Sequence, residues 1–165
     1  MSADKAKPTG SLVSPHNVGD IRVLIAEDSA TIRHHLTNMI DEIPGMRVIG
    51  QARDGEEALT LAARIRPDVI SMDIRMPRMD GMEATRRSMA ECPTPVVVVS
   101  GLVQRDVELS FKAIEAGALA VVEKPPARSH PAFVAKHHEL ARTLAAMARV
   151  SVVRRGNTRL LGDSA

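Results

Sequence analysis

The amino-acid sequence predicts an α/β domain built on a doubly wound, five-stranded parallel sheet with a flavodoxin-like (βα)5 arrangement. Two observations predict this fold class. Five short apolar runs show no alternation with polar residues, which is typical of parallel strands buried on both faces. A stretch with helical periodicity follows each run, as right-handed βαβ crossovers require. An open doubly wound sheet is the natural architecture for such a chain.

The predicted elements follow one another in regular order. Strands are expected as IRVLIA (21–26), MRVIGQA (46–52), DVISM (68–72), PVVVVS (95–100) and ALAVVEK (118–124). Helices are expected over about 29–42, 55–65, 81–90, 105–116 and 131–149. Ser29 can cap the first helix, Pro44 and Gly45 end it, and Pro67 starts the third strand. Gly117 stands where a glycine commonly follows a helix C-terminus.

The 165 residues divide into one body and two polar ends. Residues 1–19 are rich in Lys, Pro, Gly and Ser and are predicted to be disordered. The folded domain is expected over 20–149, and 150–165 are expected to form a basic tail or linker. Residues 1–126 carry 15 basic and 18 acidic side chains, whereas 127–165 carry 7 and 2. The basic end could contact nucleic acid or an acidic partner, but the near absence of aromatic residues favours a solvated linker.

Composition also indicates the cellular compartment in which the protein works. Cys92 is the only cysteine, which excludes an intramolecular disulfide and favours a reducing environment. The first twenty residues contain no apolar signal segment, and no apolar run approaches the length of a membrane span. We therefore expect a cytoplasmic protein that binds neither membrane nor nucleic acid.

Residues able to carry chemistry stand where the predicted strands end. Glu27 and Asp28 follow the first strand, Asp73 follows the third, Ser100 ends the fourth and Lys124 ends the fifth. In open α/β sheets the ligand crevice lies outside the carboxyl ends of the strands. These side chains are therefore expected to converge on one pocket.

Three carboxylates in one pocket repel one another, by about 4 kcal/mol for two unit charges about 4 Å apart at an effective dielectric near 20. A cation would offset this repulsion, and oxygen ligands without His or Cys favour a hard ion such as Mg²⁺. Lys124 could offset part of the charge and bind an anion. A carboxylate beside a metal, a lysine and a hydroxyl is suited to receive a phosphoryl group, with Asp73 as nucleophile.

The ordered set of motifs resembles the receiver domain of two-component response regulators. The resemblance rests on Glu27-Asp28-Ser29, MDIRMPRMDGMEA (72–84), VVVVSG (96–101) and EKPP (123–126), and it covers about residues 20–126. It implies the strand order 2-1-3-4-5. Within this family, TPVVVVSGL, AIEAGALAVVEKPP and RVSVVRR look most like the receiver of chemotaxis protein-glutamate methylesterases.

The resemblance also implies a role for each site residue. Asp73 would be the phosphoacceptor, and Mg²⁺ would be held by Asp28, Asp73 and the backbone carbonyl of Arg75, with Glu27 acting directly or through water. Ser100 and Lys124 would contact the phosphoryl oxygens. The implied donor is a phosphohistidine on a sensor histidine kinase, and phosphorylation would change contacts with an output protein or effector domain. Whether the phosphorylated form is a homodimer is left open.

Two features concern details of this site. The bond between Lys124 and Pro125 is expected to be cis. Receivers usually carry an aromatic residue three positions before the lysine, and Val121 stands there. We therefore expect phosphorylation without the usual aromatic switch, and an output that uses shifts in the 101–121 region.

Alternative functions fit the sequence less well. The main alternative is an isolated regulatory domain of a protein-glutamate methylesterase whose catalytic domain is absent from this chain. No enzyme activity is expected beyond phosphotransfer and autodephosphorylation, because no G-x-S-x-G nucleophile motif occurs. A phosphatase of the haloacid dehalogenase type would need an acid where Arg75 stands. Too little chain follows the last helix for a helix-turn-helix, and no glycine-rich loop supports a cofactor binder.

Single residues also have simpler interpretations. Glu27 and Asp28 could merely cap the first helix, and Ser100 is distinctive only as a member of the set. The adjacent histidines at 34–35 and 137–138 cannot chelate one ion, because helix neighbours point about 100° apart. We interpret them as solvated or partly packed, and the nine methionines as core and loop packing.

Overall fold

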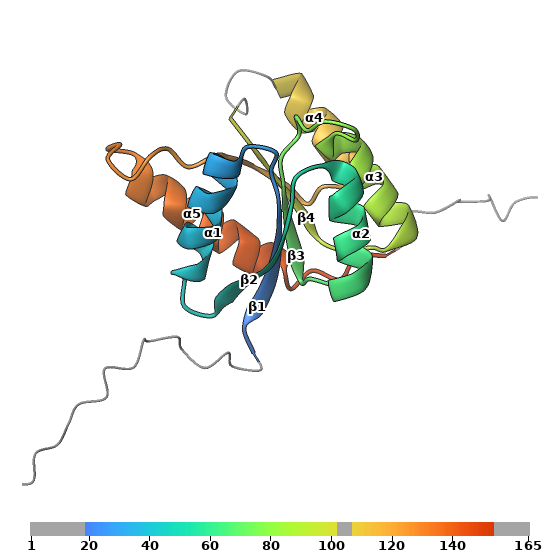
Figure 1. Cartoon of the computed structure of the whole chain (residues 1–165), viewed down its shortest axis with the longest axis horizontal. Helices are drawn as coiled ribbons and strands as arrows, with labels where there is room; N and C mark the ends of the chain where they lie inside the picture. Colours follow the sequence, from blue (N-terminus) through green and yellow to red (C-terminus); the bar gives the residue numbers. More distant parts are fainter. Residues whose placement is uncertain (1–18, 102–106, 154–165) are drawn as a thin grey trace, which may run out of the picture.

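The computed structural model describes residues 19–101 and 107–153, which form five strands alternating with five helices (Figure 1). The elements are β1 (Ile21–Ala26), α1 (Ala30–Asp41), β2 (Met46–Ala52), α2 (Gly55–Ile65), β3 (Val69–Met72), α3 (Gly81–Glu91), β4 (Val96–Ser100), α4 (Val107–Ala116), β5 (Ala120–Glu123) and α5 (Phe133–Met147). Residues 1–18 of the segment expected to be disordered and 154–165 of the expected tail lie outside the described residues.

The five strands form one parallel sheet in the order β2-β1-β3-β4-β5, which confirms the predicted fold class. β3 lies at the centre and is buried along its whole length. Its register places Met72 beside Ala26 of β1 and beside Val98 of β4. The carboxyl ends of β1, β3 and β4 therefore meet at one edge of the sheet.

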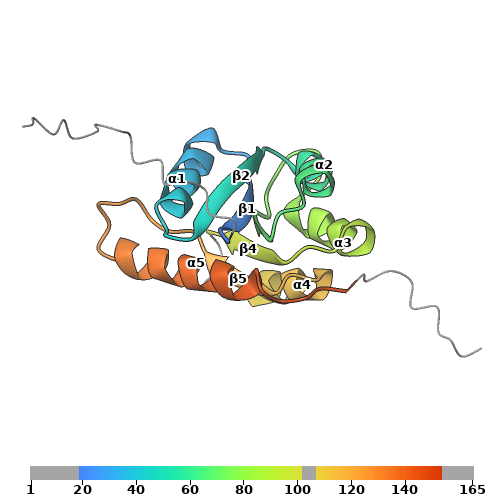
Figure 2. The same ribbon diagram turned by 90° about the horizontal axis from the view of Figure 1, so that it is seen from below.

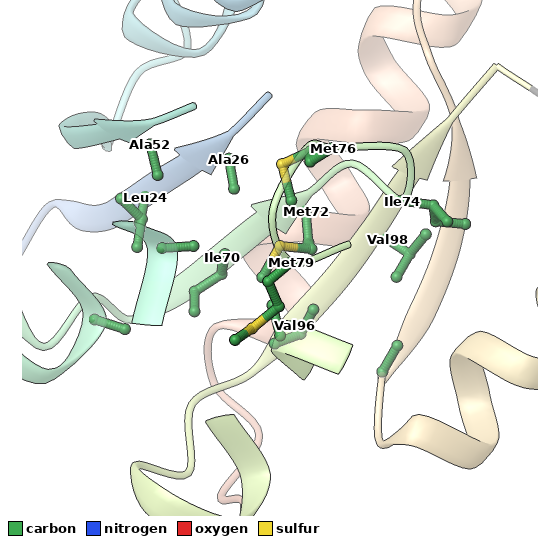
Figure 3. Packing of buried hydrophobic residues seen from close by; sticks show 14 of the residues in the cluster. Leu24, Ala26, Ala52, Ile70, Met72, Ile74, Met76, Met79, Val96 and Val98 are labelled. Carbon is green, nitrogen blue, oxygen red and sulfur yellow. The ribbon is translucent and has the colours of Figure 1, made fainter. Parts of the chain in front are cut away.

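Helices cover both faces of the sheet: α1 and α5 lie on one face, and α2, α3 and α4 lie on the other (Figure 2). Strand side chains alternate between the faces. Leu24, Ile70 and Val98 belong to the core beneath α2, α3 and α4, part of which Figure 3 shows. Val23 and Val97 belong to the core beneath α1 and α5. Continuous apolar runs thus supply two cores at once.

Local signals set most helix ends. Ser29 Oγ accepts a hydrogen bond from the Ile32 amide and caps α1, as predicted. Gly45 and Gly117 have φ of 82° and 115°, so each ends its preceding segment in a conformation that favours glycine. The predicted helix at 131–149 is shorter in the structure, where α5 spans Phe133–Met147. α4 is described over Val107–Ala116, and positions 105 and 106 of its predicted range lie outside the described residues.

The surface of α4 carries a stripe of apolar side chains. Val107, Phe111 and Ile114 are 71%, 69% and 46% exposed. The second phenylalanine, Phe133, is buried between α1 and α5, where its ring stacks on His137 and also neighbours His35. The histidines at 35 and 137 are therefore packed.

In the described residues, no helix has the length and apolar content needed to span a membrane.

Candidate functional site

The candidate site lies at the carboxyl edge of the sheet, where backbone pairing continues one residue past the strands. The Asp73 amide donates to Ala26 O at 2.9 Å, and the Lys124 amide donates to Ser100 O at 3.0 Å. These hydrogen bonds fix Asp73, which follows β3, and Lys124, which follows β5. The structure thereby brings together the strand-end residues that the sequence predicts.

Lys124 joins two of the three predicted acids. Its Nζ lies 2.8 Å from Glu27 Oε2 and 3.3 Å from Asp73 Oδ2. Glu27 is 1% exposed and Asp73 is 7% exposed, so both carboxylates are buried beside the ammonium group. The lysine is therefore held inside the site by charge and is not an ordinary surface residue.

The three acids form a group that could hold a metal ion. One ligand oxygen from each of Glu27, Asp28 and Asp73 lies within 4.8 Å of the others. Three carboxylates and one ammonium leave a formal charge of −2, which a divalent cation would neutralise. Glu27 Oε2 lies 2.8 Å from Lys124 Nζ, so the ammonium already offsets one of the three negative charges. The residues present therefore fit a hard divalent ion bound by oxygen.

Burial and charge shift the pKa of two site groups. Desolvation is the main cause that raises the pKa of Glu27, with the negative charge of Asp73 acting in the same direction, and the ammonium of Lys124 opposes both. For Lys124, burial acts to lower the pKa, but Glu27 and Asp73 together outweigh it and the pKa is raised. Lys124 therefore remains a cation at neutral pH.

The other predicted residues lie close by. Ser100 is 4% exposed at the end of β4 and pairs with β5, while Asp28 is exposed at the rim. Arg75 lies in the loop two residues beyond Asp73, with its side chain exposed. Val121 is partly buried against the core beneath α2, α3 and α4. A small aliphatic side chain thus occupies the position where the resemblance implies an aromatic one.

One prediction about the site is wrong. The peptide bond between Lys124 and Pro125 is trans. The preference between the two forms of an X–Pro bond is only about 0.5–1 kcal/mol, so a dipeptide in a sequence does not fix the isomer.

The structure adds residues that the sequence interpretation missed. Arg33 of α1 donates from Nη1 to the carbonyl of Glu27 at 2.9 Å and to that of Asp28 at 3.5 Å. Arg33 therefore holds the acidic loop after β1. Its position one helical turn after Ser29 was the available signal, since an arginine there can reach back over the preceding loop.

Gly81 closes the loop that follows β3. Its amide donates to Ile74 O at 2.8 Å. A methyl group on Gly81 would overlap Asp73 O and lie 2.8 Å from the Asp73 carbonyl carbon. Glycine is therefore required by the close approach of two backbone segments, and the Gly81 in the MDG motif was its sequence signal.

The fold and the site together define a flavodoxin-like α/β domain with a cluster of three acids and a lysine at the carboxyl edge of its sheet. Comparison with known proteins places it more closely. Residues 23–131 match the family model described as the response regulator receiver domain. The chain belongs to the response regulator receiver domain family.

Individual relatives agree with this assignment. The chain is 56% identical over 135 residues to protein-glutamate methylesterase/protein-glutamine glutaminase 4 of Myxococcus xanthus, which covers 82% of this chain and 38% of that protein. The response regulator domain of Thermotoga maritima CheB superposes with a TM-score of 0.72 at 37% identity, covering 80% of this chain and 98% of that one. A structure of the P1 domain of CheA3 in complex with CheY6 from R. sphaeroides contains a chain that superposes with a TM-score of 0.65 at 33% identity. The match covers 80% of this chain and 100% of that one. The chain spans well under half the length of the curated relative.

Proposed function

We propose that this domain is the phosphoacceptor module of a two-component system and that Asp73 receives the phosphoryl group from a phosphohistidine of a sensor histidine kinase. The observation that carries the proposal is the convergence of Glu27, Asp28, Asp73 and Lys124 in one cluster, with Lys124 Nζ 3.3 Å from Asp73 Oδ2. Membership of the receiver family supports it.

The proposed transfer is a single displacement at phosphorus. A carboxylate oxygen of Asp73 forms the new O–P bond, the N–P bond of the phosphohistidine breaks, and the released imidazole nitrogen takes a proton from water. Lys124 is positioned to pair with a phosphoryl oxygen, and Ser100, on the neighbouring strand end, supplies a hydroxyl. The buried strand β3 holds Asp73 in place, and the exposed Asp28 beside it marks the side from which a donor would approach.

Asp28, Asp73 and the backbone carbonyl of Arg75 would hold Mg²⁺, with Glu27 acting directly or through water. The ion, when bound, offsets the negative charge that gathers where the phosphoryl group meets the carboxylates. The formal charge of −2 on the acid and lysine group supports a divalent ion.

Incubation with acetyl phosphate and MgCl₂, followed by intact-mass spectrometry, tests the proposal. Wild-type protein should gain the mass of one phosphoryl group, whereas Asp73→Asn should gain none. Lys124→Arg keeps the positive charge but changes its shape, and we expect slower modification. Equal modification of wild type and Asp73→Asn, or none in either, would contradict the assignment.

The relatives suggest a biological setting for the module. We infer that it regulates chemotaxis as the receiver part of a protein-glutamate methylesterase, because such an enzyme is 56% identical to the chain. The kinase partner we infer is of the CheA type, since the structure of CheY6 was solved with a CheA3 domain. Mass measurement of the native polypeptide isolated from its cells would decide between a receiver joined to a methylesterase and a free-standing one, and phosphotransfer from purified CheA would test the partner.

A further inference from the structure

The loop that follows the phosphoacceptor is fastened to a neighbouring helix by two adjacent contacts. Arg78 donates from Nε at 2.9 Å and from Nη2 at 2.5 Å to Asp54 Oδ2. The next residue, Met79, accepts at its carbonyl a 2.9 Å hydrogen bond from the Gly55 amide. Residues 54 and 55 are the N-cap and the first residue of α2, so the loop apex is tied to the start of that helix.

The anchor on the helix side is a buried carboxylate with partners on both oxygens. Asp54 is 2% exposed, and its other oxygen, Oδ1, accepts from the Glu57 amide at 2.9 Å and caps α2. A methyl group on Gly55 would overlap Met79 O and lie 2.9 Å from Met79 Cβ, so the backbones approach too closely for a side chain there. One carboxylate thus serves the helix with one oxygen and the loop with the other.

Arg78 adopts a backbone conformation that its side chain disfavours. Its φ is 65°, in the left-handed region where residues other than Gly, Asn and Asp are uncommon. Such outliers persist where the surroundings hold them, and they gather at functional sites. Two interactions surround this one: the contact of the Arg78 side chain, itself 63% exposed, with the buried carboxylate, and the hydrogen bond from the Gly55 amide to Met79 O.

The contact between Arg78 and Asp54 also links the loop after β1, which carries Glu27, to the loop after β3, which carries Asp73. The Glu27 amide donates to Ala52 O at 2.9 Å, two residues before Asp54. The path therefore runs from Glu27 through β2 to Asp54, then through Arg78 back to Asp73. Backbone pairing fixes Asp73 itself, whereas Arg75 lies on the part of the loop between Asp73 and Arg78.

We propose that Arg78 and Asp54 form a clamp that positions the 73–81 loop and thereby sets the affinity of the acidic site for a divalent cation. Both are positioning residues that act through the loop. The inference rests on the proposed function, because the cation is the one inferred for phosphotransfer.

Isothermal titration with MgCl₂ alone, without a phosphodonor, tests the clamp. We expect Arg78→Gln and Asp54→Asn each to weaken Mg²⁺ binding by about tenfold, the lower end of the effect of losing a residue that orients metal ligands. Asparagine is as good an N-cap as aspartate, so Asp54→Asn spares the helix. The double variant should bind no more weakly than either single variant, because both remove one interaction.

A second readout does not involve the metal. Amide hydrogen exchange in metal-free protein should be faster at Met79 and Gly81 in Arg78→Gln, with exchange in β1 and β3 unchanged. Arg86→Gln is the matched control, since Arg86 is an exposed arginine of α3 paired with Glu83. Arg78→Lys keeps the charge without the planar fork and should fall between wild type and Arg78→Gln.

The outcomes separate the clamp from the proposed function. If wild type is phosphorylated and binds Mg²⁺ but both clamp variants bind it within twofold of wild type, the clamp is refuted and the function stands. Losses that multiply in the double variant would also refute it. If wild type binds no Mg²⁺ and accepts no phosphoryl group, the proposed function fails and the clamp fails with it.

Discussion

Replacing Gly81 with alanine should displace the backbone of Asp73, the proposed phosphoacceptor, without changing any side chain of the site. The new methyl carbon would overlap Asp73 O and lie 2.8 Å from the Asp73 carbonyl carbon and 2.9 Å from Ile74 Cα. Real Cβ atoms essentially never approach other heavy atoms closer than 3.0 Å. All three obstacles are backbone, so rotating a side chain cannot relieve the overlap.

The magnitude follows from this geometry. Overpacking that forces a backbone shift costs about 1–3 kcal/mol, and a rigid backbone obstacle places Gly81→Ala toward the upper end. Helix propensity opposes this by no more than about 1 kcal/mol, because alanine is favoured over glycine in a helix. We therefore expect a net loss of about 1–2 kcal/mol in the free energy of unfolding, and slower phosphorylation because the Asp73 backbone moves.

Urea unfolding followed by far-ultraviolet circular dichroism measures the stability change, and intact-mass spectrometry after acetyl phosphate measures the rate. Gly101→Ala is the control for stability, since a methyl group there would meet nothing within 4 Å. Wild-type stability together with a wild-type phosphorylation rate in Gly81→Ala would refute the reasoning.

Three further predictions concern stability and its pH dependence. Leu140→Ala, at a fully buried position of α5, should cost about 2–5 kcal/mol in urea unfolding, whereas Val134→Ala, at a position 63% exposed, should stay within about 0.5 kcal/mol of wild type. The pKa of Lys124 is raised, so the contribution of its charge to stability is complete below the usual lysine value of 10.5 and is lost as pH rises through the raised pKa. The difference in the free energy of unfolding between wild type and Lys124→Gln should therefore shrink above pH 10.5. A difference that stays constant would contradict this. The pKa of Asp54 is lowered mainly by the hydrogen bond from the Glu57 amide and also by Arg78, while burial opposes both. The contribution of the Asp54 charge to stability is therefore present above pH 3.8 and is lost as pH falls through the lowered pKa. The stability difference between wild type and Asp54→Asn should disappear over the same range in acid unfolding, and a difference that persists at the acid limit would contradict this.

The sheet was predictable from the sequence because parallel strands buried on both faces leave continuous apolar runs. β2 and α2 have the predicted bounds, Met46–Ala52 and Gly55–Ile65. β5 spans Ala120–Glu123, which is shorter than the predicted 118–124, because Ala118 and Leu119 before it are as apolar as the strand itself. Apolar content reports burial, whereas strand ends depend on partner backbone.

The positions of the site residues were also predictable, since the carboxyl ends of parallel strands meet at one edge. The clamp between Arg78 and Asp54 was not, because it joins residues 24 positions apart through a left-handed arginine. A backbone conformation that a residue disfavours leaves no signal in its identity. Asp54 gave only the signal of a helix cap, which its Oδ1 indeed provides.

Within residues 19–101 and 107–153, the sheet separates two apolar compartments that have no side chain in common. Leu24 faces one of them and its neighbour Val23 faces the other. Changes of volume in different compartments should therefore combine additively, as they do for sites without common neighbours. The layer under α1 and α5 can then be redesigned for greater thermal tolerance while Ile74, Met76 and Met79, which anchor the loop after Asp73, keep their own neighbours in the other layer.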